Sequence, residues 1–164
     1  EIERLELIAA ELTGASQPLR LEPAALQGVV DEVLDLMGRR LDHLGVRVAR
    51  AYAPAPSVRV DAARFKRCVM NLVLNGAQAM PAGGPLEVAV APRDGKVRFS
   101  VKDAGPGLPP EIRDRAFDPF VTTKQDGVGL GLALTKRIVE DHRGEIGFAP
   151  GPGGTTFWIE LPHG

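Results

Sequence analysis

Cysteine and histidine are scarce in this 164-residue sequence, which has one cysteine and three histidines. Cys68 has no second cysteine to pair with, so an internal disulfide and a cysteine-based metal site are excluded. We interpret Cys68 as a small buried apolar residue. His43, His142 and His163 are scattered without the spacing of metal ligands, and we interpret them as ordinary surface or helix-end residues.

The sequence also lacks an excess of charge and any long apolar run. Lys and Arg number 20 and Asp and Glu 21, which gives a net charge of −1. Nothing therefore indicates a surface for nucleic acid or for an anionic membrane. The unbroken apolar runs are far shorter than the roughly 20 residues that cross a bilayer. The remaining composition is ordinary for a globular protein, and the length favours one domain.

Hydrophobic periodicity and turn signals predict a chain that mixes helices and strands. Asp61 is a good N-cap for a long helix, and Asp94-Gly95 is typical of a β-hairpin turn. Because neighbouring strands are often joined by short turns, we expect a mixed, mostly antiparallel sheet. The predicted fold is α+β: a two-layer α/β sandwich with three main helices on one face. Helices are predicted over residues 1–12, 24–43, 62–80 and about 131–142, and strands over 19–21, 46–52, 57–60, 86–90, 97–102, 145–149 and 155–161.

A polar stripe marks the helix predicted over residues 62–80. Asn71, Asn75 and Gln78 share one face, while most surrounding residues are apolar. Buried amides need partners, so hydrogen bonds to neighbouring backbone would explain the two asparagines. The alternative is that an amide oxygen binds a hard cation such as Mg²⁺, which takes oxygen ligands and shares its remaining sites with phosphates.

Two glycine-rich stretches follow. Asp103 ends the predicted strand 97–102, and Gly105 and Gly107 come directly after it, so the backbone can turn sharply and approach a ligand closely. The segment 127–131 has glycine at every second position and runs into a helix, an arrangement that favours an anion such as phosphate. Residues 108–126 between them lack clean periodicity, which is typical of a lid or binding loop.

These elements together resemble the ATP-binding superfamily shared by gyrase, the ninety-kilodalton heat-shock chaperone, sensor histidine kinases and the mismatch-repair ATPase (the GHKL superfamily, with the Bergerat fold). Its N, G1, F and G2 boxes resemble the stretches NLVLNGAQAM, DAGPGL, FDPF and GVGLGLAL. With FDPFVTTK and the ending GGTTFWIELP, the sequence is most similar to the catalytic domain of two-component sensor histidine kinases. The resemblance covers about residues 61–162. It makes residues 1–14 the tail of a dimerisation helix with its linker, and 15–164 the ATP-binding domain with a lid at about 105–128.

The resemblance implies a role for each matching residue. Asn75 resembles the Mg²⁺-binding asparagine, with Asn71 on the phosphate side, and Asp103 resembles the aspartate that selects adenine. Thr155 or Thr156 would touch the adenine edge through water, and Phe117 and Phe120 would anchor the lid. The implied cofactors are ATP and Mg²⁺, and the implied nucleotide-binding positions are Asn71, Asn75, Gln78, Asp103, Gly105, Gly107, Leu108, Thr123, Lys124, Gly127, Val128, Gly129, Leu130, Gly131, Leu132 and Thr155.

The sequence departs from the family pattern at two positions. Gln78 stands where many of these kinases have a lysine or arginine, which leaves open which cation neutralises the phosphates; Lys124 is one candidate. Gly76 replaces the usual alanine, at a helix cost of roughly 1 kcal/mol. The family's phosphate-accepting histidine lies upstream, and none of the histidines present matches it. Because the chain begins at Glu1 inside a predicted helix, we expect a piece of a longer protein.

The implied function is transfer of the ATP γ-phosphoryl group to a histidine on a separate dimerisation domain, and onward to a response-regulator aspartate. The implied location is cytoplasmic, with this piece a monomer and its parent a homodimer; no nucleic acid or membrane is an expected partner. Two alternatives remain open from the sequence. One is a serine kinase of the anti-sigma type, and the other is a regulatory module that senses ATP without phosphorylating anything.

Overall fold

The computed structural model describes residues 18–119, 131–151 and 153–163. A five-stranded sheet has the order β2-β4-β5-β7-β6, with a small separate sheet of β1 and β3. Three of the four pairings in the large sheet are antiparallel and β2–β4 is parallel, so the predicted mixed, mostly antiparallel sheet is confirmed. The strands are β1 Glu22–Ala24, β2 Val46–Tyr52, β3 Val58–Val60, β4 Gly84–Arg93, β5 Lys96–Lys102, β6 Glu145–Gly151 and β7 Gly154–Pro162.

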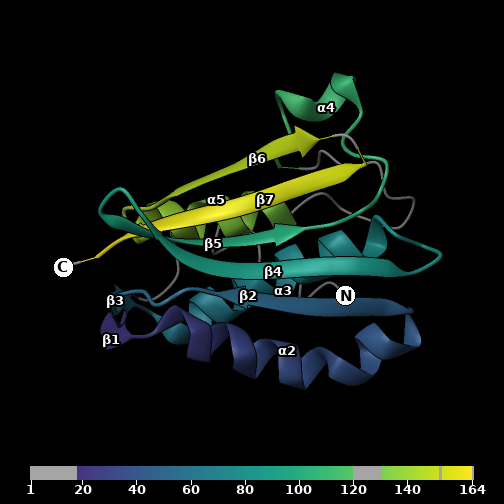
Figure 1. Ribbon diagram of the computed structural model, residues 1–164. Coiled ribbons are helices and arrows are strands. Elements are labelled where there is room, and N and C mark those ends of the chain that lie inside the picture. Colours follow the sequence, from purple (N-terminus) through teal and green to yellow (C-terminus); the bar gives the residue numbers. More distant parts are fainter. Residues whose placement is uncertain (1–17, 120–130, 152, 164) are drawn as a thin grey trace.

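Three helices make the second layer of the sandwich (Figure 1). The helix α3 packs between α2 and α5 and also contacts β4 and β5 in the middle of the sheet. The two-layer α+β sandwich predicted from the sequence is therefore confirmed. A short helix lies in the segment that follows β5. The helices are α2 Leu26–His43, α3 Ala62–Gln78, α4 Pro110–Arg113 and α5 Gly131–Asp141. Among the described residues, no helix is both long enough and apolar enough to cross a bilayer.

Local sequence signals account for several boundaries. The Asp61 side chain accepts a hydrogen bond from the backbone N–H of Arg64 at 3.2 Å, as expected of the N-cap of α3. Asp94 and Gly95 join β4 to β5 and both have positive φ, at 50° and 78°, which the predicted hairpin turn requires. The start of the described chain differs from the prediction. The short strand lies at 22–24 rather than 19–21 and α2 begins at Leu26, because Glu22–Ala24 pairs with β3 instead of opening the helix.

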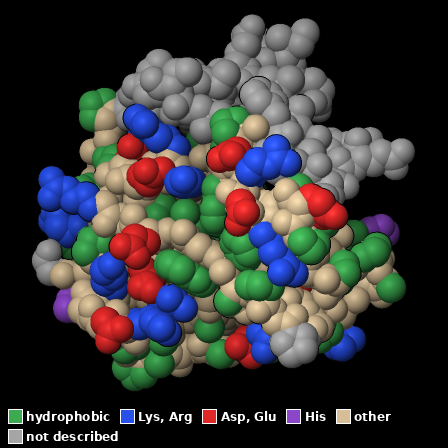
Figure 2. Space-filling model, turned by 90° about the horizontal axis from the view of Figure 1, so that it is seen from above, with side chains coloured by type: hydrophobic (Ala, Val, Ile, Leu, Met, Phe, Trp, Pro, Cys, Tyr) green, Lys and Arg blue, Asp and Glu red, His purple; other side chains and the backbone are tan. Residues whose placement is uncertain are grey.

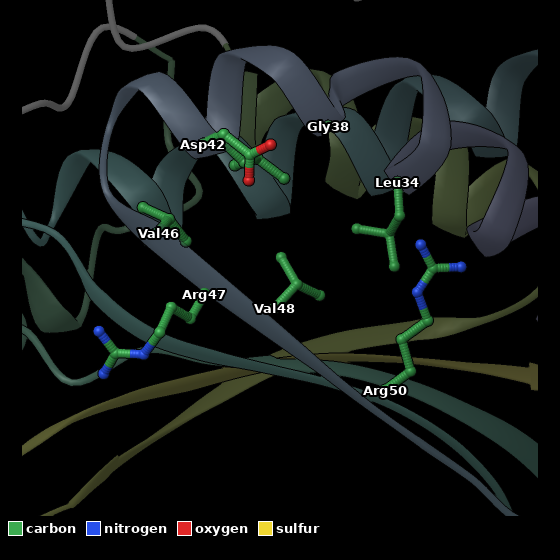
Figure 3. A pocket seen from close by; sticks show the side chains of 8 residues that line it. Leu34, Gly38, Asp42, Val46, Arg47, Val48 and Arg50 are labelled. Atoms are coloured by element: carbon green, nitrogen blue, oxygen red, sulfur yellow. The ribbon is translucent and has the colours of Figure 1, made fainter.

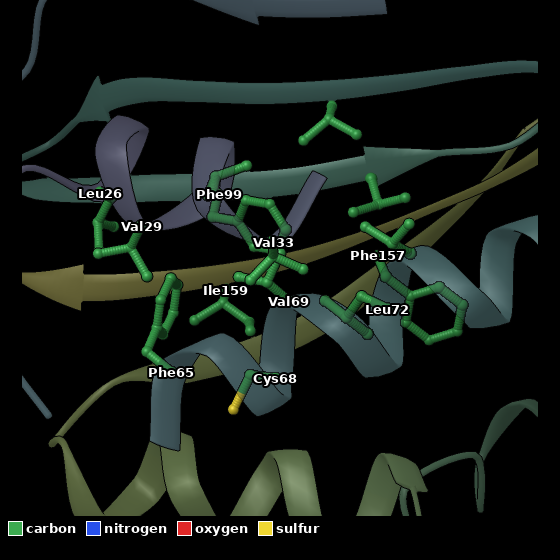
Figure 4. Packing of buried hydrophobic residues seen from close by; sticks show 14 of the residues in the cluster. Leu26, Val29, Val33, Phe65, Cys68, Val69, Leu72, Phe99, Phe157 and Ile159 are labelled. Carbon is green, nitrogen blue, oxygen red and sulfur yellow. The ribbon is translucent and has the colours of Figure 1, made fainter. Parts of the chain in front are cut away.

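One apolar core joins the two layers. Phe65 of α3 meets Phe99 of β5 edge to face, with ring centroids 5.9 Å apart. Val69 and Leu72 continue the same face of α3 toward β7 (Figure 4). Cys68 is fully buried, as the sequence indicated, and burial raises the pKa of its thiol. The core fixes α3 against the middle of the sheet, which determines where the polar stripe of this helix lies.

His142 fits one of the two alternatives given by the sequence interpretation, a helix-end residue rather than a surface residue. It follows α5 directly, as a helix-end residue, but it is buried rather than on the surface. Its Nε2 accepts a hydrogen bond from the backbone N–H of Asp61 at 3.0 Å. A backbone N–H only donates, so Nε2 carries no proton, and Nδ1 donates to the carbonyl of Ile138 at 2.7 Å. A neutral imidazole thus joins the end of α5 to the start of α3.

We expect replacement of His142 by alanine to destabilise the domain by about 1–3 kcal/mol, because the buried N–H of Asp61 loses its acceptor. Urea denaturation measures this change in the free energy of unfolding. The matched control is His43→Ala at the exposed end of α2, which should change stability by no more than about 0.5 kcal/mol. Equal effects of the two substitutions would show that the contact with Asp61 contributes nothing.

Candidate functional site

Asp103 lies immediately after β5 and is buried, with 5% of its surface exposed. Its backbone N–H donates to the carbonyl of Thr155 at 3.0 Å, and its Oδ1 accepts from the backbone N–H of Gly105 at 2.9 Å. Burial raises the pKa of the Asp103 carboxyl, and hydrogen bonds from the backbone of Gly105 and Thr155 oppose that rise. A carboxylate has about four acceptor positions, so this one retains capacity for a ligand that donates a hydrogen bond.

The loop after Asp103 is held tightly on both sides. A Cβ atom at Gly105 would lie 2.4 Å from the carbonyl oxygen of Ala79, just past the end of α3. The N–H of Ala104 points to the sulfur of Met80 at 3.4 Å. On the other side, a Cβ at Gly154 would lie 1.9 Å from the carbonyl oxygen of Asp103. Close backbone approach, rather than unusual φ at Gly105, explains why this loop needs glycine.

Thr155 supplies the second polar group beside Asp103. Its hydroxyl is buried and has no hydrogen-bond partner among the described residues. It lies 3.6 Å from the position that a Cβ on Gly107 would occupy, and Gly107 has a φ of +83°. A buried hydroxyl without a partner carries a desolvation penalty that a bound ligand would relieve. The carboxylate and the hydroxyl therefore fit a planar base with polar edges, such as adenine.

The three amides of the α3 stripe have different surroundings. Asn71 is half-buried, and its Nδ2 donates to the carbonyl of Gly131 at 3.3 Å and to the hydroxyl of Thr135 at 3.2 Å. Asn75 is also half-buried, and Gln78 is exposed. Gly76 follows Asn75, and a Cβ there would lie 3.6 Å from the Cβ of Asp103. The residue after Asn75 thus packs on the aspartate at the end of β5.

The other predicted site residues are only partly covered by the structure. Gly131 begins α5, so the helix predicted after the glycine-rich loop is present. Leu108 and Leu132 are half-buried and pack against the core. Phe117 contacts Phe148 and Phe157, with ring centroids 6.1 and 6.2 Å away, which is the packing role expected for it. The remaining predicted residues lie outside the described part of the chain: Phe120, Thr123, Lys124, Gly127, Val128, Gly129 and Leu130.

Sequence reasoning missed two residues that hold this site together. Thr135 is fully buried and bonds both Gly131 and Asn71. It could have been noticed as a polar residue on the apolar face of a helix, beside Leu134 and Ile138. Met80 lies just after α3, and its sulfur accepts the backbone N–H of Ala104 in the loop that follows β5. Met80 is the last residue of the stretch NLVLNGAQAM, but that stretch does not reveal its contact, which is with backbone from another element.

Charge and surface shape give little guidance to the site. Basic and acidic side chains are interspersed on the face shown in Figure 2, so no field of one sign develops there. A pocket of about 300 Å³ lies between α2 and β2 (Figure 3) and shares no lining residue with the site at Asp103. Its Arg50 is already paired with Asp31 and Asp35.

Among the described residues, no three His, Cys, Asp or Glu side chains gather as metal ligands. A cation here would depend on amide oxygens and on its ligand.

The fold and this arrangement match one family of proteins. The chain belongs to the family described as histidine kinase-, DNA gyrase B-, and HSP90-like ATPase, whose model matches residues 60–164. The domain therefore binds ATP. Within that family it is the catalytic ATP-binding domain of a two-component sensor histidine kinase, which the following similarities show.

Three known proteins illustrate the relationship. Sporulation kinase A of Bacillus subtilis (strain 168) is 32% identical over 167 residues, which cover 99% of this chain and 28% of that protein. The crystal structure of full-length ShkA in complex with AMPPNP matches with a TM-score of 0.83 at 33% identity, over 97% of this chain and 36% of that one. Histidine kinase ThkA in complex with the response regulator TrrA matches with a TM-score of 0.83 at 28% identity, over 99% of this chain and 48% of that one. This chain thus spans half or less of each.

Substitution of Gly105 by alanine should weaken ATP binding at least about tenfold and destabilise the domain by about 1–3 kcal/mol. The reason is that the new methyl group would meet the carbonyl oxygen of Ala79 and push the loop with Asp103 away from α3. Titration calorimetry and urea denaturation measure the two effects.

The matched control is Gly38→Ala, inside α2, where a Cβ has no atom within 4 Å. That change should raise stability by up to about 1 kcal/mol and leave ATP affinity unchanged. Normal ATP affinity in the Gly105→Ala variant would mean that the position of this loop does not matter for the nucleotide.

Proposed function

We propose that this domain binds ATP together with Mg²⁺ and transfers the γ-phosphoryl group to a histidine on a separate dimerisation domain, from which it passes to a response-regulator aspartate. The buried carboxylate of Asp103, beside a Thr155 hydroxyl that has no partner in the part of the chain that the structure describes, is the observation that supports the nucleotide site most strongly. ThkA, crystallised with a response regulator, supports the downstream partner by analogy. We place the domain in the cytoplasm, as the catalytic part of a homodimeric kinase.

The residues divide the work between the two ends of the nucleotide. Asp103 accepts a hydrogen bond from the adenine amino group, and Thr155 meets the same edge of the ring directly or through water. Gly105 and Gly107 let the backbone come close to the base. On α3, Asn75 holds Mg²⁺ through its amide oxygen, with Asn71 nearby. Mg²⁺, when bound, bridges phosphate oxygens and neutralises the charge that develops during transfer.

The described residues contain no evident nucleophile or general base for this reaction. The protein contributes by positioning the nucleotide, and the acceptor histidine comes from another domain. We include residues 105–128 in the proposal as a lid over the phosphates. We also propose that Lys124 and residues 127–130 contact the nucleotide. This division of labour predicts that the domain alone binds ATP with little or no turnover.

Replacement of Asp103 by asparagine should weaken ATP binding without destabilising the fold. We expect ATP affinity to fall about 10- to 100-fold, because a charged acceptor for the adenine amino group is lost. The fold should be retained and be at least as stable near neutral pH. Burial raises the pKa of the Asp103 carboxyl, so its contribution to stability is present at low pH and is lost as pH rises through that pKa. Asparagine removes the cost of the buried charge.

Calorimetry with ATP and urea denaturation at several pH values test this prediction. The stability difference between the variant and the original protein should close as the pH falls below the ordinary range of an aspartate. Asp94→Asn, at an exposed hairpin position, is the control for loss of one negative charge. Unchanged ATP affinity in Asp103→Asn would refute the assignment of this residue to the base.

Phosphoryl transfer itself requires the domain joined to upstream dimerisation helices that carry the acceptor histidine. With radiolabelled ATP and Mg²⁺, we expect a protein-bound phosphate that is labile in acid and stable in base. The Asn75→Ala variant should lose this labelling, and its ATP affinity should no longer respond to added Mg²⁺.

Other results would point to other functions. Acid-stable phosphate would indicate a serine kinase, and ATP binding without any labelled protein would indicate a module that only senses ATP. Retention of the Mg²⁺ response in Asn75→Ala would contradict the metal assignment.

A further inference from the structure

Within the described residues, Thr135 is the one polar side chain among the buried residues of α5, Gly131–Asp141. Its hydroxyl lies 2.8 Å from the carbonyl oxygen of Gly131, one turn earlier in the helix. The same hydroxyl lies 3.2 Å from Nδ2 of Asn71 on α3. Nδ2 is also 3.3 Å from the carbonyl oxygen of Gly131. Three polar groups from two helices therefore meet at the start of α5.

The donors and acceptors at this junction determine which way the Asn71 amide is turned. Two oxygens 2.8 Å apart need a proton between them, and only the Thr135 hydroxyl has one to give to the carbonyl of Gly131. The hydroxyl then offers only lone pairs to Asn71, and the carbonyl of Gly131 is also an acceptor. Both require the NH₂ group of Asn71, whereas a flipped amide would place its oxygen against two acceptors. Oδ1 of Asn71 is thus not used by these partners.

Packing alone does not explain a threonine at this position. The other buried side chains of α5 are apolar: Ala133, Leu134, Ile138 and Val139. Valine has nearly the same shape as threonine and would bury no hydroxyl. A threonine that bonds back to the preceding turn brings a helix no gain in stability. The hydroxyl is therefore explained by its bond to Asn71 rather than by the stability of α5.

We propose that Thr135 is a positioning residue for phosphoryl transfer: it orients the Asn71 amide so that the amide oxygen is presented to the Mg²⁺–triphosphate part of ATP. This inference rests on the proposed function, because it places that part of the nucleotide beside α3 and the start of α5. Thr135 acts through Asn71 and makes no contact with the base site at Asp103. Its loss should affect the phosphate end of the ligand and spare the adenosine end.

The test compares the affinities for Mg²⁺–ATP and for adenosine, measured by calorimetry in the original protein and in Thr135→Val. We expect Thr135→Val to bind Mg²⁺–ATP about 3- to 10-fold more weakly, the range for loss of one hydrogen bond, and adenosine with unchanged affinity. Thr135→Ser, which keeps the hydroxyl, should restore the affinity for Mg²⁺–ATP. Thr135→Val should be about as stable in urea as the original protein.

A double-mutant cycle separates orientation of Asn71 from a general structural effect. In the Asn71→Ala background, Thr135→Val should change the affinity for Mg²⁺–ATP no further. The inference would be overturned if Thr135→Val left the ratio of the Mg²⁺–ATP and adenosine affinities unchanged. It would also be overturned if the effects of the two substitutions were additive in the cycle. If the original protein bound Mg²⁺–ATP no better than adenosine, the proposed function itself would be wrong. This outcome is measured without any substitution, so it can be told apart from a failure of the role proposed for Thr135.

Discussion

The contact between the end of α3 and the chain that leaves β5 is the constraint on which the site depends. Gly76 allows α3 to pack on Asp103, and Gly105 allows the following loop to lie on the carbonyl of Ala79. A Cβ at Gly105 would be too close to that carbonyl without a shift of neighbouring atoms, whereas a Cβ at Gly76 would meet the side chain of Leu86 at 2.6 Å. Because α3 also carries Asn71 and Asn75, this packing brings the amide stripe and the buried carboxylate to the same end of the sandwich. The apolar core beneath, around Phe65 and Phe99, holds the helix in that position.

Buried polar groups occur at few places in the described chain, and their hydrogen bonds distinguish structure from ligand binding. Four of the six bond to other elements or to neighbouring turns: Asp61, Thr135, His142 and Glu160. Asp103 accepts from its own loop but remains a buried carboxylate with a raised pKa. Thr155 has no partner for its hydroxyl among the described residues. The backbone N–H of Asp103 bonds to the carbonyl of Thr155, so these two residues are neighbours, and a ligand there would relieve the cost of burying both polar groups.

The sequence predicted the parts of the fold that local chemistry determines. The Asp94-Gly95 turn and the Asp61 N-cap depend on the conformational preferences of these residues, and both are as predicted. The strand at Glu22–Ala24 depends on pairing with β3, a partner distant in sequence, and was placed three residues too early. His142 was interpreted as an ordinary surface or helix-end residue because nothing near it in sequence reveals that Asp61 lies against its ring. Such contacts exist only after the helices have packed.

The same distinction applies to the site. The family resemblance made Asp103 and Asn71 candidate site residues because motifs record residue types at fixed spacing, but it could not show how each side chain is held. Met80 ends the stretch NLVLNGAQAM and Thr135 directly follows GVGLGLAL, but the motifs do not reveal their contacts, since each acts on a backbone or amide group from another element. Thr135 accepts a hydrogen bond from the Asn71 amide at the end that we propose for the phosphates, and the N–H of Ala104 points to the sulfur of Met80 at the end that we propose for the base. These two contacts share no residue. In the proposed function, the base end and the phosphate end of the nucleotide would therefore be supported by separate contacts, each made with a residue of α3 or of the turn that follows it.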